Sequence, residues 1–580
     1  MKRLRLVLLL VLLAVLLIAA WLWFNVPRQV DLAEYAPADS MLYVEFNSLA
    51  DVAHAIQYTD VWKAAAPITH STPGNDNRLL TAAARAGVAP VESVLFTRTQ
   101  IALVVLGLNT IQQDDTLKVR PEIALIAETH TARWRTRPVM VDAVKRLANY
   151  VYGASSCVGP NGDRFECSLP GGERKLIGLI HGTAIILANS DDALARCVAV
   201  REGARPSIST DAEFVRSRAS VATPQSLGFG YVSAANSAKL FSWAAPLWMG
   251  VAPVDQQLQQ LLANSAGKIL GGIAWTAVPS GGGIEDRFVF SLEPGVTTRL
   301  QPAFDTGAHD ENIWQLVPGS FQSLTIYRSR EPLAAWTSLD MAVASKVDAV
   351  SAALFGTLLK SSLLVYGIEN PKEALAAFSP PLLTMRPAGA EGSVLIGRVN
   401  DEARLRKSLE AETVKGSSPL QGQTAKGSAP PQILAGLQAE PDAAKEFTAV
   451  FVEGFVILGK TENVRACLVE LRKNQAAVSE EKKAVQDAAR QSSAAIVTYS
   501  NDEARLTNFI STLLTLQGRQ LSDDDFSKLQ NTFGSSSFAA TETRLSATGI
   551  ERKTRSAFGQ FSTFIALLQP NRANSVARER

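Results

Sequence analysis

KLIGLIHGTAIILANSDDALARCVA (residues 175–199) and EFTAVFVEGFVILGKTENVRACLVE (residues 446–470) follow the same plan. Each reads as an apolar strand, a two-residue turn that ends in glycine, a second apolar strand and a helix with one cysteine. The turns, His181-Gly182 and Glu453-Gly454, suit tight hairpins. Two copies of one supersecondary unit predict an internal repeat.

Other pairs of similar stretches occur in the same order along the chain. The paired stretches begin at residues 37 and 318, 103 and 363, 123 and 394, 209 and 478, 227 and 494, and 282 and 548. Their spacing stays at about 260 to 285 residues throughout. We therefore predict two duplicated lobes, residues 31–305 and 306–570, followed by a polar tail at residues 571–580.

The local building block is a strand that runs through a polar cap into a helix. The sequence NDEARL follows an apolar strand twice, at residues 400–405 and 501–506, and its polar start suits a helix N-cap. Strands such as Met41–Phe46 alternate between two faces, with Val44 on one and Glu45 on the other. This pattern favours antiparallel sheets with one face covered by helices, which is an α+β fold.

Residues 454–461, GFVILGKT, match the phosphate-loop pattern letter for letter. A phosphate loop needs free backbone N–H groups that curl around the anion, but Phe455–Leu458 is the most strand-like run nearby. Gly454 belongs to the hairpin turn, and the matching stretch from Gly182 has no Gly-Lys pair. The prediction is a hairpin and no nucleotide partner.

The N-terminus reads as a membrane anchor. Three basic residues precede the apolar run Leu6–Phe24, which is about 28 Å long as a helix and so matches one hydrocarbon core. Basic flanks stay in the cytoplasm, and Trp21 and Trp23 suit the far interface. We predict that residues 1–30 form a cytoplasmic start and a single-pass anchor in the inner membrane, with the bulk of the chain in the periplasm or extracytoplasmic space. The alternative is a signal peptide cleaved after Ala20.

The chain has four cysteines. Cys157 and Cys167 flank a stretch with strong turn signals, so a hairpin would bring their thiols together in an oxidising compartment. The prediction is a disulfide, and the alternative is two unrelated thiols. Cys197 and Cys467 stand singly in predicted helices and are expected to be inert buried thiols.

Composition and motifs point away from the common chemistries. A formal net charge of +2 does not suggest nucleic-acid binding. The five histidines are scattered, and neither zinc-type cysteine pairs nor a nucleophile elbow occur in the sequence. We therefore predict no catalytic residues, no metal site and no cofactor.

The most apolar stretch after the N-terminus is LFSWAAPLWMG, residues 240–250. Its Phe241, Trp243, Trp248 and Met249 could dock onto lipid or a protein partner. The alternative interpretation is a core helix kinked at Pro246.

The opening of the first lobe resembles a known family. Pro37-Ala38-Asp39 followed by MLYVEFNSLADV is similar to the start of a family of uncharacterised bacterial membrane-anchored envelope proteins, known only as a domain of unknown function. The second lobe departs from this pattern at Pro318-Gly319-Ser320. The resemblance implies an envelope location and no catalytic residues.

These patterns together predict a non-catalytic binding or scaffold protein of the bacterial envelope. Its expected partners are the membrane, through the anchor, and an envelope protein or lipid. Two alternatives stay open: a carrier of lipid or another hydrophobic ligand, and an untypical envelope hydrolase assembled from distant residues.

Overall fold

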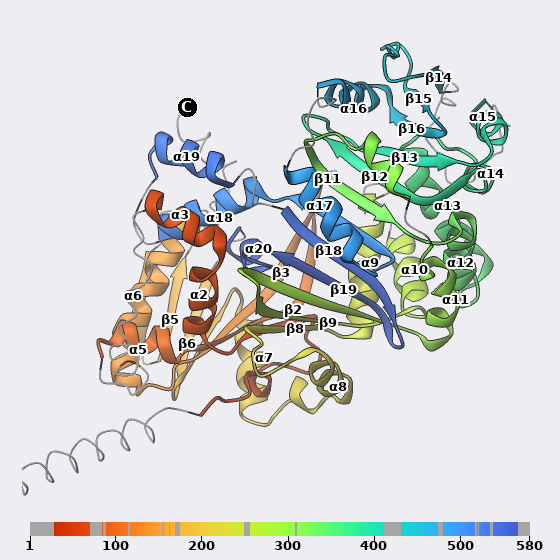
Figure 1. Cartoon of the computed structure of the whole chain (residues 1–580). Helices are drawn as coiled ribbons and strands as arrows, with labels where there is room; N and C mark the ends of the chain where they lie inside the picture. Colours follow the sequence, from red (N-terminus) through yellow and green to blue (C-terminus); the bar gives the residue numbers. More distant parts are fainter. Residues whose placement is uncertain are drawn as a thin grey trace, which may run out of the picture.

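A computed structural model of the chain shows an α+β protein built on one large, mainly antiparallel sheet of 19 strands (Figure 1). It describes residues 28–566 except for 70–83, 85–88, 114–115, 153–155, 162, 169–174, 249–255, 308–309, 411–430, 474–479, 517–518, 520 and 534–537. The predicted α+β class is confirmed. The predicted anchor and polar tail lie outside the described residues, apart from residues 28–30. No described helix is both long enough and apolar enough to cross a bilayer.

The strands of the first half form a continuous antiparallel array. Their spatial order is β4-β5-β6-β7-β3-β2-β1-β8-β9-β10. Their bounds are β1 Leu42–Phe46, β2 Gln100–Gln113, β3 Thr116–Glu128, β4 Ser156–Asn161, β5 Arg164–Ser168, β6 Lys175–His181, β7 Ala184–Ala188, β8 Gly228–Val232, β9 Leu270–Ser280 and β10 Gly283–Leu292.

The strands of the second half are arranged in the same way. Their spatial order is β14-β15-β16-β13-β12-β11-β17-β18-β19, and only the β14–β15 pairing is parallel. Their bounds are β11 Phe321–Tyr327, β12 Phe378–Pro387, β13 Val394–Val399, β14 Gln432–Ala435, β15 Phe447–Val452, β16 Phe455–Lys460, β17 Ile496–Asn501, β18 Phe538–Ser546 and β19 Gly549–Ser556.

The two spatial orders match strand for strand: β6-β7-β3-β2-β1-β8-β9-β10 in the first half corresponds to β15-β16-β13-β12-β11-β17-β18-β19 in the second. One sequence match was nevertheless wrong: Leu103 lies in β2, whereas Leu363 lies in the last turn of helix α13. The strand that occupies the place of β2 is β12. An apolar run alone does not distinguish a strand from a helix, and the run at Leu363 continues a helix that begins at Ala349.

The hairpin at Glu453-Gly454 has the predicted geometry. Both residues have positive φ, +47° and +82°, as a tight two-residue hairpin turn requires. Strand β16 pairs with β15 on one side and with β13 on the other, and Ile457 lies between Val450 and Ile396. The segment between Gly454 and Gly459 is therefore an inner strand of the sheet, and it does not have the form of a phosphate loop.

Each copy of the NDEARL sequence begins a helix, and both copies lie in the second half of the chain. Helix α15 starts at Glu402 after β13, and α18 starts at Glu503 after β17. The Asp401 carboxylate accepts a hydrogen bond from the Arg404 N–H at 2.9 Å, and the Asn501 side chain accepts one from the Glu503 N–H at 2.8 Å. The predicted asparagine cap is confirmed at Asn501, whereas in the first copy Asp401 caps the helix in place of Asn400.

Helices cover both faces of the sheet in the first half (Figure 1). The described helices are η1 Leu32–Tyr35, α2 Leu49–Gln57, α3 Asp60–Thr69, α5 Val91–Arg98, α6 Arg133–Tyr152, α7 Asp191–Arg201, η2 Ile208–Thr210, α8 Ala212–Val221, α9 Ala234–Trp248, α10 Gln256–Ala266, α11 Pro294–Phe304, η3 Glu311–Leu316, α12 Pro332–Ala344, α13 Ala349–Leu364, α14 Pro371–Leu375, α15 Glu402–Glu410, α16 Thr461–Lys473, α17 Glu480–Gln491, α18 Glu503–Leu516, α19 Asp523–Phe533 and α20 Phe561–Ala566.

Strand β1 shows that the expectation of a single covered face was wrong. Val44 belongs to the core beneath α2 and α3, whereas Tyr43 belongs to the core on the opposite face, with Phe214 of α8. The strand pattern suggested a solvated face because Glu45 is acidic. That carboxylate is instead buried beside the Arg218 guanidinium, so both faces of the strand are covered.

The two halves join edge to edge. Strand β10 pairs antiparallel with β19 from Ile284↔Ser556 to Ser291↔Gly549. Two ion pairs cross this junction: Arg287 with Glu551 at 2.6 Å, and Arg555 with Glu285 at 2.9 Å. Since Glu285 and Glu551 hold the same position in the matched stretches from residues 282 and 548, each half presents the same residue to the other, as in a symmetric dimer interface.

Glycine occupies the same place at both ends of the junction. A Cβ on Gly283 would lie 2.6 Å from the Ser556 carbonyl oxygen, and one on Gly549 would lie 2.0 Å from the Phe290 carbonyl oxygen. The glycine that begins each Gly-Ile-Glu sequence is therefore explained by the close approach of the two backbones.

Helices also pack across the junction. Helix α3 of the first half contacts α19 of the second, and α13 of the second half contacts α10 of the first (Figure 1). One apolar cluster contains Trp62 together with Phe509, Phe533 and Phe558. At the other contact, the Ser265 hydroxyl donates to the Ser351 hydroxyl at 2.8 Å. The two halves thus share cores as well as a sheet.

A buried carboxyl lies in the junction strand itself. Asp286 is fully buried and accepts a hydrogen bond from the Trp275 indole N–H at 2.9 Å. Burial raises the pKa of Asp286 from 3.8 to about 6, although this hydrogen bond opposes the rise.

Replacing Gly549 tests the junction. Gly549→Ala places a Cβ against the Phe290 carbonyl, and we expect it to lower the free energy of unfolding by about 3 kcal/mol or more. The matched control is Gly454→Ala, which has positive φ but open space around the new Cβ and should cost about 1 kcal/mol. Denaturant unfolding measures both, and equal losses would contradict the close approach.

The Asp286 pKa makes stability depend on pH. Because the folded state raises this pKa, its contribution to stability is fully present below about pH 4 and is lost as the pH rises through about 6. Asp286→Asn removes the effect, so the variant should gain up to about 3 kcal/mol relative to wild type between pH 4 and pH 7.5. The exposed Asp523→Asn should gain nothing. Urea unfolding at pH 4 and pH 7.5 measures the free energy of unfolding of each variant. If the gain of Asp286→Asn were the same at both pH values, the raised pKa of Asp286 would be refuted.

Candidate functional site

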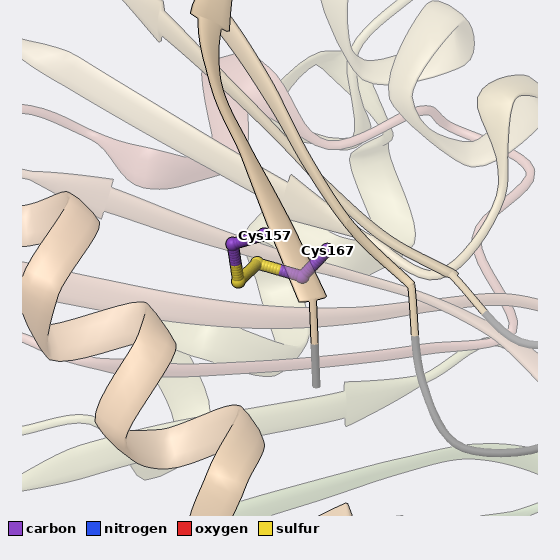
Figure 2. The surroundings of a disulfide bond; sticks show 2 residues. All are labelled: Cys157 and Cys167. Atoms are coloured by element: carbon purple, nitrogen blue, oxygen red, sulfur yellow. A yellow bond between two sulfur atoms is a disulfide. The ribbon is translucent and has the colours of Figure 1, made fainter. Parts of the chain in front are cut away.

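The predicted disulfide is present. Cys157 of β4 and Cys167 of β5 are paired across adjacent strands and bonded through their sulfur atoms (Figure 2). Cys197 and Cys467 are free thiols buried in the two cores, and burial raises the pKa of each to about 12. A thiol with so high a pKa is a poor nucleophile, which agrees with the prediction that both are inert.

Residues near the start of the described chain are packed in the core of the first half. We call residues 30–38 the leading segment. Leu32, Ala33 and Ala36 in this segment are fully buried. Its backbone is held from outside as well: the Ser207 hydroxyl donates to the Ala33 carbonyl at 2.6 Å, and the Ile208 N–H donates to the Ala36 carbonyl at 2.9 Å. Residues 32–36 are therefore an integral part of the first-half core.

Gln100 clamps the beginning of the leading segment. Its side-chain oxygen accepts the Val30 N–H at 2.9 Å, and its side-chain amide donates to the Val30 carbonyl at 3.0 Å. The same oxygen lies 2.8 Å from Nε2 of His130. Because Gln100 is the first residue of β2, an inner strand, the clamp ties Val30 to the centre of the sheet.

A buried carboxylate continues this network. Glu128 is buried. Its carboxylate accepts hydrogen bonds from the Tyr35 hydroxyl at 3.1 Å and from the backbone N–H of His130 at 3.0 Å. Burial, with a further contribution from Glu128, raises the pKa of Tyr35 to about 12. Burial also lowers the pKa of His130, so its imidazole stays neutral at pH 7.

A second buried network holds Asp31. The Arg218 guanidinium donates to the Asp31 carboxylate at 3.0 Å and to the Glu45 carboxylate at 2.5 Å. Glu45 is 1 % exposed and also accepts a hydrogen bond from the Tyr43 hydroxyl at 2.7 Å. Burial raises the pKa of Glu45, and Arg218 opposes that rise. The sequence pattern missed this network because the partners are far apart in the chain.

Helix α13 is the most unusual surface feature of the second half. Its sequence, AVSAALFGTLLKSSLL, has hardly any polar face, and a helix that is apolar all round is normally buried. Only Ser351 and Leu354 are buried, however, while Val350 is 68 % exposed and Val365, just past its end, is 53 % exposed. We call α13 with Val365 the apolar helix surface.

A hollow of about 410 Å³ lies beside the apolar helix surface, between α12, α13 and α14. Trp336 and Leu359 give it an apolar wall. Asp340, Lys360 and Lys372 supply charges of both signs around it. An aromatic residue with a mixed-charge rim is typical of a protein-binding surface.

The predicted docking patch of Phe241, Trp243, Trp248 and Met249 is only partly within the described residues. Phe241 packs against the cluster formed by Leu262 and Leu354, so it serves a core contact. Trp243 is half-buried on α9. Trp248 lies in the last turn of α9, and Met249 lies outside the described residues. The alternative of a core helix therefore holds for Phe241.

Comparison of the chain with protein-family models, curated proteins and solved structures finds no match. Within the described part of the chain, no His, Cys, Asp and Glu side chains gather in a group that could hold a metal ion.

Replacing Arg218 tests the second network. Arg218→Leu leaves the buried Glu45 carboxylate without its counter-ion, and we expect a loss of about 3–5 kcal/mol in unfolding free energy. The control is Arg164→Leu, which breaks an exposed ion pair with Asp191 and should cost less than about 1 kcal/mol. The double variant Glu45→Gln/Arg218→Leu should recover part of the loss. Similar losses for both single variants would show that the network is not buried as described.

Proposed function

We propose that the protein is a single-pass, membrane-anchored binding or scaffold protein of the bacterial envelope, with its body in the extracytoplasmic space. The apolar run Leu6–Phe24 supports the anchor, and the Cys157–Cys167 disulfide is consistent with an oxidising compartment. The buried leading segment would transmit the position of the anchor to the rigid sheet.

We further infer that the body arose by duplication of one α+β unit, with lobes at residues 31–305 and 306–570. The shared strand order supports this, as do the matched Gly-Ile-Glu sequences that meet at the β10–β19 junction. On this proposal the lobes have diverged. The first lobe holds the leading segment, and the second carries the apolar helix surface.

The exposure of α13 is the observation that carries the binding role. Large apolar side chains that remain outside the core, next to a hollow with an aromatic wall, favour a docking surface. A protein partner fits better than an anionic bilayer. Asp340 borders the hollow together with Lys360 and Lys372, so the rim offers complementary charges to a protein, whereas its carboxylate would repel lipid phosphate.

Site-specific photo-crosslinking in living cells tests the binding role. A photo-reactive residue at Val350 or at Val365 of the full-length chain should give an adduct with one and the same protein. The control position is Val215 of α8, which is 51 % exposed but stands apart from α13, and it should not give that adduct. Val350→Glu should weaken the adduct formed at position 365 about tenfold or more. An equal adduct at position 215, or none at either α13 position, would contradict the proposal.

A further inference from the structure

Two aromatic side chains stand exposed near the start of the described chain. Trp134, in the first turn of α6, is 78 % exposed, and Phe96 of α5 is 49 % exposed. The two helices pack against each other. Isolated exposed aromatics are common, but Trp has an apolar ring and a polar N–H, which suit it to the level of lipid headgroups.

Basic side chains occur on the same two helices and just before the leading segment. Arg98 closes α5 and donates to the His130 carbonyl at 3.4 Å. The Arg135 guanidinium lies 6.0 Å from the centre of the Trp134 ring. Arg137 follows on α6, and the exposed Arg28 precedes the leading segment. Glu92, in the first turn of α5, is the acidic residue on that helix, so the group has a net positive charge.

The Gln100 clamp brings this group close to the membrane end of the chain. Val30 is bonded to Gln100, which is only two residues beyond Arg98 and lies 2.8 Å from His130. The apolar run ends at Phe24, six residues before Val30. Even a fully extended chain spans no more than about 22 Å over this distance. The exposed aromatics and arginines are therefore held near the surface of the bilayer in which the apolar run would sit.

We propose that Phe96, Trp134 and the four arginines (Arg28, Arg98, Arg135 and Arg137) dock onto the bilayer that holds the anchor, and that they recognise anionic phospholipid. The rings lie at headgroup level, and the guanidinium groups pair with lipid phosphates. This inference rests on the proposed membrane anchor. The contact fixes the orientation of the body, because two separate attachments, the anchor and this surface, allow less rotation than one.

Orientation matters for the apolar helix surface. In Figure 1, α5 lies on the left of the molecule, the side from which the described chain starts (red), and α12 and α13 lie on the right. Docking through α5 and α6 therefore turns α13 away from the bilayer, where an extracytoplasmic protein can reach it.

A fluorescent probe at position 96 tests the docking. The full-length Phe96→Cys chain can be labelled selectively, because Cys157 and Cys167 are bonded to each other and Cys197 and Cys467 are buried. The labelled chain is reconstituted into phosphatidylcholine vesicles with or without phosphatidylglycerol, both containing brominated lipid as quencher. We expect strong quenching only with phosphatidylglycerol. A probe at Val469 of α16, which is 39 % exposed, should be quenched in neither.

Reversing the charge of two arginines tests the electrostatic part of the docking. Arg28→Glu/Arg137→Glu should lower the ratio of docked to undocked molecules by at least about fivefold for each arginine. Trp134→Ala should lower it as well. The circular dichroism spectrum of each variant should match wild type, since all three side chains are at least partly exposed.

The outcomes separate this inference from the proposed anchor. A chain that stays with the vesicles after a carbonate wash, but whose probe at position 96 is not quenched, overturns the docking and leaves the anchor standing. Equal quenching in both kinds of vesicle overturns the recognition of anionic lipid. A chain that the wash releases overturns the anchor and the docking together.

Discussion

The antiparallel pairing of β10 with β19 is the interaction on which the rest of the architecture depends. Without it each half would end in an open edge strand, and such edges invite aggregation. The pairing turns two similar arrays into one sheet and brings α3 against α19 and α10 against α13. Gly-Ile-Glu occurs on both sides of this junction, at residues 283–285 and 549–551, where the two backbones approach closely.

Polar groups buried beside this sheet hold the leading segment in place. Gln100 of β2 and Arg218 of α8 hold the leading segment through side-chain hydrogen bonds. Buried polar groups are costly unless all their partners are in place, so such networks favour one arrangement of the chain. A tether that joins a rigid body in this way can set the position of distant surfaces, and α13 is the surface that gains from it in the proposed function.

Several parts of the fold were predictable from local patterns. The Glu453-Gly454 hairpin, the helices that begin within NDEARL and the Cys157–Cys167 bond all depend on residues close together in sequence. The Leu363 match failed because an apolar run suits a strand and an apolar helix equally well. The Asp31–Arg218–Glu45 network could not be predicted, since its members lie far apart in the chain. The exposed apolar helix at residues 349–364 was not predicted, because its exposure depends on which neighbours the tertiary fold provides.

Hydrogen exchange of the backbone amides in β10 and β19, in the full-length chain, tests the central claim most directly. If the two halves form one sheet, the amides of residues 284–291 and 550–556 that bond across the junction exchange only when the whole body unfolds, as slowly as those of the inner strand β2. Exchange at the fast rate of an outer strand such as β14 would show that the halves are not joined in this way.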